Sequence, residues 1–284
     1  MRVSVVMAGR NSNPALLKEA INSVLNQTFK DFEFIIVDDG SDKPLGSIVH
    51  SVSSDQRISV YRIESSGLGA ALNYGIKHSS GDLIARIDDD DISLPTRFEK
   101  QVAFMDCHPE VNCLGTQLYY KYGNNIYPHS LFPLNHSDIL KQLSNLHFVM
   151  GHTVLMYRRK SFDQIGGYRI SGGGQDLDLF LQLGTIGELA NLNEYLGCYT
   201  LSPIGLSVVN PKKAQAYLFA LESALKYDGY NLYFNDIRAS INYLKVGGEK
   251  PLFQILGRFK RRILIFATKY LGRNIDKLLR QDKQ

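Results

Sequence analysis

The chain has 284 residues, of which 44% are apolar and 21% charged, which excludes a disordered chain and predicts one sizeable core with or without an appended segment. Three cysteines without a CxxC pair exclude a disulfide framework and a cysteine-based structural zinc site, and they suit a reducing compartment. The net charge is +4, but residues 258–284 hold nine Lys or Arg and two Asp, which leaves −3 for the rest and argues against a nucleic-acid-binding surface.

Strand and helix patterns alternate along the first ninety residues. Short runs of β-branched and aromatic residues predict strands at 3–7, 32–37, 58–63 and 83–87. Helices are predicted from Asn13 to Leu25, where Asn13 is a good N-cap and Pro14 a good first-turn residue, and from Gly69 to His78. This alternation predicts an α/β fold with a mostly parallel sheet, helices on both faces, and ligands beyond the carboxyl ends of the strands.

The second half has a less regular pattern. It predicts a strand at 154–157, a glycine-rich loop at 172–174 and three helices, at 175–183, 211–227 and 236–245. No repeat, low-complexity tract or clear linker precedes residue 205. We therefore expect residues 1–205 to form one domain and residues 206–284 a helical C-terminal region.

Three groups of carboxylates fall at predicted element ends. They are Asp38-Asp39 after the second strand, Asp88 to Asp91 after the fourth, and Asp176 with Asp178 at the start of the helix that follows the glycine-rich loop. Four successive carboxylates repel one another unless a cation is present, and oxygen ligands suit Mg²⁺ or Mn²⁺, which could bridge a diphosphate. The alternative is a solvated acidic turn, above all for Asp38-Asp39, because Asp-Gly-Ser is ordinary turn chemistry.

Six segments occur in a fixed order between residues 3 and 176. They are Val3–Met7, Ser23–Phe29, Phe34–Ser41, Gly67–Asn73, Gly81–Asp91 with Pro95 and Arg97, and Gly166–Asp176. In this order and spacing the chain resembles the family 2 glycosyltransferases, a large inverting family. The resemblance implies the GT-A fold, a mostly parallel Rossmann-like sheet flanked by helices.

The resemblance also implies residues that bind the donor. Ala8, Arg10 and Asp39 would hold the uridine of a UDP-sugar, with Asp39 accepting a hydrogen bond from the uracil ring. In the acidic run, Asp88 would contact the ribose, Asp89 would support it, and Asp90 would bind Mn²⁺ or Mg²⁺. Asp91 would shape the turn.

The family's catalytic base is the Asp of a Glu-Asp pair after the Gly-Gly-Tyr motif. Here the pair is Gln175-Asp176, so the resemblance implies Asp176 as the base that takes the proton of the acceptor hydroxyl. Gln175 departs from the pattern, and it puts acceptor contacts in doubt because an amide lacks the charge. Asp178 is the nearest rival, but two residues along a helix it points elsewhere.

Other residues allow two interpretations each. His152 could lie near the diphosphate or be a satisfied core histidine. Arg86, like Arg97, Arg158 and Arg169, could hold phosphate or form an ordinary ion pair. The glycines at 172–174 could form a mobile lid or only give the backbone freedom.

The C-terminal tail carries its own pattern. Between Phe253 and Leu279, apolar residues recur at helical spacing with Lys and Arg interleaved, which predicts a basic amphipathic helix. We expect residues 251–284 to bind an anionic membrane surface, and the alternative is a helix docked on its own domain or on a second subunit. The N-terminus has no secretory pattern and the sequence no stretch that predicts a spanning helix, which suits the cytoplasm. The family resemblance further implies a bacterial enzyme, peripheral on the inner face of the cytoplasmic membrane.

Together these features predict an inverting, metal-dependent hexosyltransferase. It would move glucose or galactose from a UDP-sugar to a saccharide, free or linked to polyprenyl diphosphate, in O-antigen or capsule assembly. A sugar-phosphate nucleotidyltransferase is disfavoured, because the loop at 8–12 has one glycine and could not cradle a triphosphate. A non-catalytic protein that binds a sugar nucleotide or a partner remains the alternative, for which Gln175 is the hint.

Overall fold

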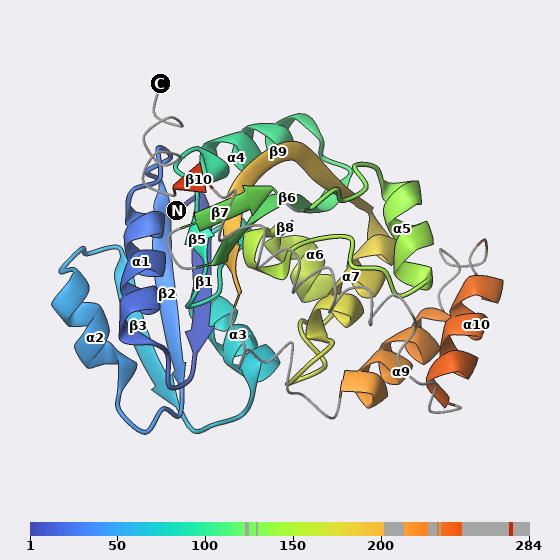
Figure 1. Cartoon of the computed structure of the whole chain (residues 1–284), viewed down its shortest axis with the longest axis horizontal. Coiled ribbons are helices and arrows are strands. Elements are labelled where there is room, and N and C mark those ends of the chain that lie inside the picture. The colour runs from blue at the N-terminus through green and yellow to red at the C-terminus, as the bar shows by residue number, and fades with distance from the viewer. Residues whose placement is uncertain are drawn as a thin grey trace.

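The structure is a computed structural model that describes residues 1–122, 125–128, 130–201, 213–226, 232, 234–245 and 273–274. Within these ranges one large sheet is flanked by helices on both faces (Figure 1). The strand order is β10-β7-β6-β8-β4-β1-β2-β3, with β9 paired to β6 and β5 paired to β9.

The first half of the chain forms the parallel part of the sheet. Its elements are β1 (Val3–Gly9), α1 (Pro14–Leu25), β2 (Phe32–Asp39), α2 (Leu45–Val52), β3 (Ile58–Ile63), α3 (Leu68–Lys77) and β4 (Leu83–Arg86). The four strands pair in parallel, as predicted, and their order is β3-β2-β1-β4. The predicted N-cap is also confirmed, because the Asn13 side chain accepts from the backbone N–H of Ala15 and Leu16 at 2.9 and 3.4 Å.

The second half continues the sheet with mixed pairing. Its elements are β5 (Ile92–Ser93), α4 (Arg97–Cys107), β6 (Val111–Tyr122), β7 (Asn125–Pro128), α5 (His136–Ser144), the 3₁₀ helix η1 (His152–Val154), β8 (Met156–Arg158), α6 (Arg159–Gln164), α7 (Gln175–Ile186), β9 (Glu188–Thr200), α9 (Lys213–Ala224), α10 (Phe234–Lys245) and β10 (Arg273–Asn274). Strand β8 is antiparallel to β4 and β6, whereas the long strands β6 and β9 are parallel to each other. The strand predicted at 154–157 is shorter and later, because η1 occupies its first residue.

Both faces of β1, β2 and β4 are buried, which explains their nearly continuous apolar sequence, whereas the edge strand β3 is only partly buried. Along β1, Val3, Val5 and Met7 pack on the face covered by α1, α2 and α4. Val6 and Ala8 point the other way, into the cluster under α3, α5 and α7. Two cores therefore lie on either side of the sheet, and they leave the strand ends as the place for polar chemistry.

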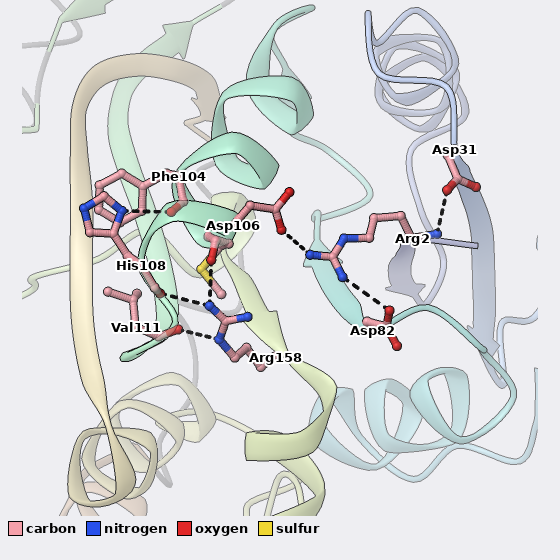
Figure 2. A network of polar contacts seen from close by, with 9 residues as sticks. Arg2, Asp31, Asp82, Phe104, Asp106, His108, Val111 and Arg158 are labelled. Carbon is pink, nitrogen blue, oxygen red and sulfur yellow. Dashed lines mark hydrogen bonds and ion pairs between the residues drawn. The ribbon is translucent and has the colours of Figure 1, made fainter.

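Charged residues tie the elements together at the amino ends of the parallel strands (Figure 2). The backbone N–H of Arg2 donates to Asp31, and its guanidinium pairs with Asp82 at 3.3 Å and with Asp106. Arg158 donates to the backbone carbonyls of Met105, His108 and Val111 at 2.7–2.9 Å, which caps the C-terminal end of α4. We call Arg2, Asp31, Asp82, Asp106 and Arg158 the amino-end network.

Helices α9 and α10 lie beside α7 and α5, on the opposite side of the molecule from α1 and α2 (Figure 1). Their apolar residues, among them Leu221 and Ile237, belong to the same buried cluster as Leu181 of α7. The Ser240 hydroxyl also donates to the Ser144 carbonyl at the end of α5, at 2.8 Å. The domain boundary predicted at residue 205 lies outside the described residues.

Most of the predicted basic tail lies outside the described residues as well. At Arg273–Asn274 the expected helix is wrong, since these two residues form β10 and pair antiparallel with β7. Strand β7 would otherwise present an open edge, whose backbone groups this pairing satisfies. In the described part of the chain, no helix is both long and apolar enough to cross a bilayer.

Candidate active site

The loops that follow β1 and β2 lie together at the carboxyl edge of the sheet. Asn11 and Asp42 exchange hydrogen bonds, with Asn11 Nδ2 donating to the Asp42 carboxylate at 3.2 Å and the Asp42 backbone N–H donating to Asn11 Oδ1 at 2.9 Å. The backbone N–H of Asn11 also donates to Ser41 Oγ at 2.9 Å. The first of these loops begins at Ala8, which is buried in β1, and continues through Arg10, which is exposed.

The two aspartates after β2 have different roles. Asp38 is buried and accepts from the backbone N–H of Ser41 and Leu45 at 2.8 and 3.0 Å, so it holds its own turn. Asp39 accepts from the backbone N–H of Ser66 and Gly67 at 2.7 and 3.0 Å, so it fixes the loop before α3. A carboxylate accepts about four hydrogen bonds, and Asp39 therefore keeps acceptor capacity for a ligand.

The four aspartates after β4, here called the acidic turn, point to different neighbours. Asp88 Oδ1 pairs with Arg86 Nη1 at 2.6 Å, and its backbone N–H donates to Thr153 Oγ1 at 3.0 Å. Asp89 lies against Gly9, where an added Cβ would stand 2.8 Å from Asp89 Oδ2. Asp91 is buried and accepts from the backbone N–H of Thr200 at 2.6 Å, which supports the prediction that it shapes the turn.

The acidic turn holds more negative charge than its surroundings offset. Burial, followed by the charges of Asp88 and Asp89, raises the pKa of Asp90 to about 7. Burial and a neighbouring aspartate likewise raise the pKa of Asp89 and of Asp91. Asp91 Oδ2 is buried and has no hydrogen-bond partner in the described part of the chain. A divalent cation would relieve this repulsion, so the donor set fits one.

Protein groups alone do not complete a coordination shell there. Among the described residues, no group of three or more His, Cys, Asp or Glu side chains is arranged to hold a metal ion. Mg²⁺-type sites commonly use one or two carboxylates together with substrate phosphates and water. The acidic turn therefore matches an ion that binds with a diphosphate donor.

Two buried arginines support the acidic turn from below. Arg97 donates to the carbonyls of Arg86, Thr153 and Leu155 at 2.7–3.3 Å, and also to Ser93 and Gln101. Burial, followed by the charge of Arg86, lowers the pKa of Arg97 to about 9. Arg86 is 0% exposed, and its Nε and Nη2 have no hydrogen-bond partner among the described residues. A buried cation without full pairing is costly, which makes Arg86 a candidate functional residue.

His152 belongs to a buried chain of hydrogen bonds. Its Nε2 lies 2.8 Å from the Tyr168 hydroxyl, which lies 3.4 Å from the hydroxyl of Tyr157. Burial, followed by the charge of Arg86, lowers the pKa of His152 well below its ordinary value. These contacts favour the core interpretation of His152 over direct diphosphate binding, and they join η1 to the Gly-Gly-Tyr motif.

The loop that leads to α7 is docked on α3. The Asn73 side chain donates to the Tyr168 carbonyl at 2.8 Å and accepts from the Tyr168 N–H at 2.9 Å. The Gly69 N–H donates to the Ser171 carbonyl at 3.0 Å, and an added Cβ at Gly69 would stand 2.0 Å from the Ile170 carbonyl oxygen. Glycine is required there for close approach, so the Gly67–Asn73 segment places this loop.

At the start of α7 the carboxylates Asp176 and Asp178 differ in what they contact. Asp178 is buried, forms a bidentate pair with Arg169 and accepts from Gln182 at 2.9 Å. Asp176 is partly exposed and lines a hollow between α5, α7 and α9. Its neighbour Gln175 has a buried Oε1 without a hydrogen-bond partner among the described residues. The geometry therefore favours Asp176 over Asp178 as the base.

The sequence identified Asn73 and Tyr168 only as parts of motif segments. It identified Arg97 as part of a motif and as one of four arginines that could hold phosphate. Their roles depend on contacts with residues far along the chain. The signal that could have found them is their place in the ordered motifs, since each lies inside a segment that also carries glycines or aspartates of the site.

The arrangement of strands and helices is the GT-A fold of glycosyltransferases, as predicted, with the acidic turn beyond β4 and Asp176 at the start of α7. The chain belongs to glycosyl transferase family 2, whose family model matches residues 4–166.

Curated and solved relatives agree with this assignment. The O-antigen biosynthesis glycosyltransferase WbnJ of Escherichia coli is 32% identical over 183 residues, which cover 64% of this chain and 71% of WbnJ. The structure of Staphylococcus aureus TarS 1–349 with UDP-GlcNAc superposes with a TM-score of 0.71 at 19% identity, covering 86% of this chain and 72% of TarS 1–349. The structure of the mannosyltransferase PcManGT of Pyrobaculum calidifontis, in complex with GDP-Man and Mn²⁺, superposes with a TM-score of 0.62 at 14% identity. The superposition covers 93% of this chain and 80% of PcManGT.

Proposed function

We propose that this chain is an inverting hexosyltransferase that moves glucose or galactose from a UDP-sugar to a saccharide acceptor. The acceptor is free or linked to polyprenyl diphosphate, and the product belongs to a surface polysaccharide such as O-antigen or capsule. The relative WbnJ carries an O-antigen biosynthesis name, which supports this setting. The enzyme would work in the bacterial cytoplasm, peripheral on the inner face of the membrane, with residues 251–284 as the membrane contact.

The observation that carries the proposal is the contrast between Asp176 and Asp178. Asp178 is bound by Arg169 and Gln182, whereas Asp176 is partly exposed and lines a hollow. As base, Asp176 takes the proton of the acceptor hydroxyl while the hydroxyl oxygen attacks the anomeric carbon. The bond from that carbon to the diphosphate oxygen breaks, and UDP leaves from the opposite face.

Donor binding is assigned to the carboxyl edge of the sheet. Asp39, with Ala8 and Arg10, would hold the uridine, Asp88 the ribose and Asp90 the Mn²⁺ or Mg²⁺ ion, with Asp89 in support. The ion would neutralise charge on the diphosphate as it leaves. The relatives with bound donors hold UDP-GlcNAc in one case and GDP-Man with Mn²⁺ in the other, so Asp39 carries our choice of a UDP donor.

The deciding experiment pairs two isosteric variants, Asp176→Asn and Asp178→Asn. UDP-sugars and GDP-sugars are offered with Mn²⁺ and saccharide or lipid-diphosphate acceptors, and nucleotide release and product linkage are measured. We expect Asp176→Asn to lower turnover by about 10²- to 10⁴-fold while donor binding persists. Asp178→Asn should mainly lower stability, because it weakens a buried ion pair.

Two results would refute the proposal in different ways. Equal turnover in wild type and Asp176→Asn would show that the base is misassigned. Donor binding without turnover in any donor and acceptor combination would favour the alternative, a non-catalytic protein that binds a sugar nucleotide, for which Gln175 is the sequence hint. Activity with a GDP-sugar alone would remove Asp39 from its assigned role.

A further inference from the structure

The hollow that contains Asp176 has a largely apolar wall. Helix α5 and the loop after it supply Leu146 and Phe148, α7 supplies Phe180, and α9 supplies Tyr217. One carboxylate in a pocket of apolar and aromatic side chains matches a ligand that has both hydroxyl groups and an apolar face. The donor-binding edge, in contrast, is rich in aspartates.

Leu146 enters this wall from a strained backbone. Its φ is +59°, a left-handed conformation that glycine or asparagine adopts readily and leucine rarely does. The backbone N–H of Leu146 donates to the Leu143 carbonyl, and that of His147 to the Gln142 carbonyl, both at 2.9 Å, which closes the end of α5. A glycine would make the same turn without strain, but it would lack the Leu146 side chain, which packs against the large buried cluster and also lines the hollow.

Phe148 and Tyr217 complete the wall from two different elements. Phe148 is 55% exposed, yet its ring packs edge-on against Phe132 at 5.3 Å, so an exposed aromatic ring is held in place. Burial, followed by the charge of Asp176, raises the pKa of the Tyr217 hydroxyl, which therefore stays protonated and able to donate.

Helix α9 is fixed in this position by contacts that do not involve the pocket. Arg169, which pairs with Asp178 of α7, also lies over the ring of Phe219 at 5.2 Å. Leu221 and Ala224 of α9 are buried in the same cluster as Leu181 of α7. The C-terminal helical region thus supplies a wall of the pocket that holds the base.

We propose that Leu146, Phe148 and Tyr217 form the acceptor subsite, and that they select a pyranose that packs its C–H face on this wall. The inference rests on the proposed function, because Asp176 is the base that the acceptor hydroxyl must reach. An aromatic and aliphatic wall binds the apolar face of the ring, and the carboxylate beside it receives the reacting hydroxyl. The α5 loop and α9 then set acceptor choice, while the acidic turn sets donor choice.

Ligand-observed NMR tests the subsite without any need for turnover. Methyl glucosides, galactosides and N-acetylglucosaminides are added to the full chain, and saturation transfer to their ring C–H protons is measured. We expect transfer in wild type and in Asp176→Asn, and at least a fivefold loss in Leu146→Gly and in Tyr217→Ala. Leu131→Ala is the control, because Leu131 is 91% exposed and does not line the hollow.

Thermal unfolding separates this role from a purely structural one. Leu146→Gly removes the strain but also the packing of Leu146 on the buried cluster, and these effects oppose each other. The variant should therefore still unfold in one cooperative transition while pyranoside binding falls. Unchanged saturation transfer in both pocket variants, or no transfer to any pyranoside in wild type, would overturn the subsite. Those outcomes differ from failure of the proposed function, which appears as equal turnover in wild type and Asp176→Asn.

Discussion

Charged side chains gather at both ends of the parallel strands, and the two ends differ in how those charges are satisfied. In the amino-end network Arg2 pairs with Asp82 and Asp106, and Arg158 donates to three backbone carbonyls (Figure 2). The side chains of Asp82 and Asp106 are 76% and 52% exposed. At the acidic turn Arg86 is fully buried with unpartnered N–H groups, and three aspartates have raised pKa values.

The difference separates polar groups that hold the fold from polar groups that await a ligand. Exposed ion pairs contribute little to the free energy of unfolding, so a substitution in the amino-end network should lower stability only slightly. Buried charges that lack partners are expensive, and a fold keeps them where binding a ligand compensates. The first two predictions below compare matched residues from the two ends, and the last two each concern one end.

The largest effect is expected from Arg86→Met compared with Arg2→Met. Removing Arg86 takes away the cation paired with Asp88, so the acidic turn loses its arrangement for the donor. Transfer activity should fall by about 10²- to 10³-fold, as for other preorganised charges in active sites. Arg2→Met should keep wild-type turnover and lose at most about 1 kcal/mol of unfolding free energy. Steady-state kinetics and urea unfolding measure both, and similar kinetics in the two variants would break the comparison.

Arg97→Lys and Arg158→Lys form the second pair. An ammonium cannot replace a guanidinium that donates to several carbonyls at once, and the carbonyls left behind at Arg97 are buried. Urea unfolding should show a loss of about 2–3 kcal/mol for Arg97→Lys. Arg158 is itself only partly buried, unlike Arg97, so water can compensate part of the lost hydrogen bonds and Arg158→Lys should cost about 1 kcal/mol. A larger loss at Arg158 would contradict this ranking.

The elements that the sequence predicted are those whose pattern reflects local burial. Strands β1, β2 and β4 are mostly apolar because both of their faces are covered, whereas the edge strand β3 is only partly buried. Asn13 could be predicted as the N-cap of α1 because its hydrogen bonds are local. Strand β6 was missed because Thr116, Gln117 and Lys121 interrupt its apolar pattern. These side chains are nevertheless buried, since Gln117 bonds to Ser130 and Phe132 and Lys121 pairs with Glu19. Such long-range partners leave no periodic signal.

The candidate site divides in the same way. The carboxylates could be found from sequence, because four adjacent charges are unusual whatever surrounds them. The apolar wall at Leu146 could not be found from sequence, since a residue in the left-handed conformation is normally glycine or asparagine. The role of Arg97 could not be found from sequence either, because the sequence around a single arginine does not show whether the side chain is exposed or buried.

The third prediction concerns the pH dependence of stability at His152. The folded state lowers the pKa of His152, so below the ordinary value of about 6.5 the unfolded chain binds a proton that the folded chain does not. The contribution of His152 to the free energy of unfolding is therefore complete above that pH. Below it, the free energy of unfolding falls by about 1.4 kcal/mol per pH unit, until the pKa of His152 in the folded state is reached. His152→Asn should remove this part of the slope in urea unfolding between neutral and mildly acidic pH. Tyr168→Phe, which keeps the histidine, should retain it, and equal slopes in wild type and His152→Asn would contradict the prediction.

The smallest effect is expected from Asp82→Asn in the amino-end network. The Asp82 side chain is 76% exposed and lies 3.3 Å from Arg2 Nη1, and Arg2 keeps its pair with Asp106 when Asp82 is neutral. Solvent and salt screen such a pair, so the loss should be below about 0.5 kcal/mol and should vanish at high ionic strength. Urea unfolding at low and high salt measures it, with transfer activity unchanged in both. A loss of activity here would mean that the amino end is coupled to the acidic turn through β4, and the two ends could no longer be treated as independent.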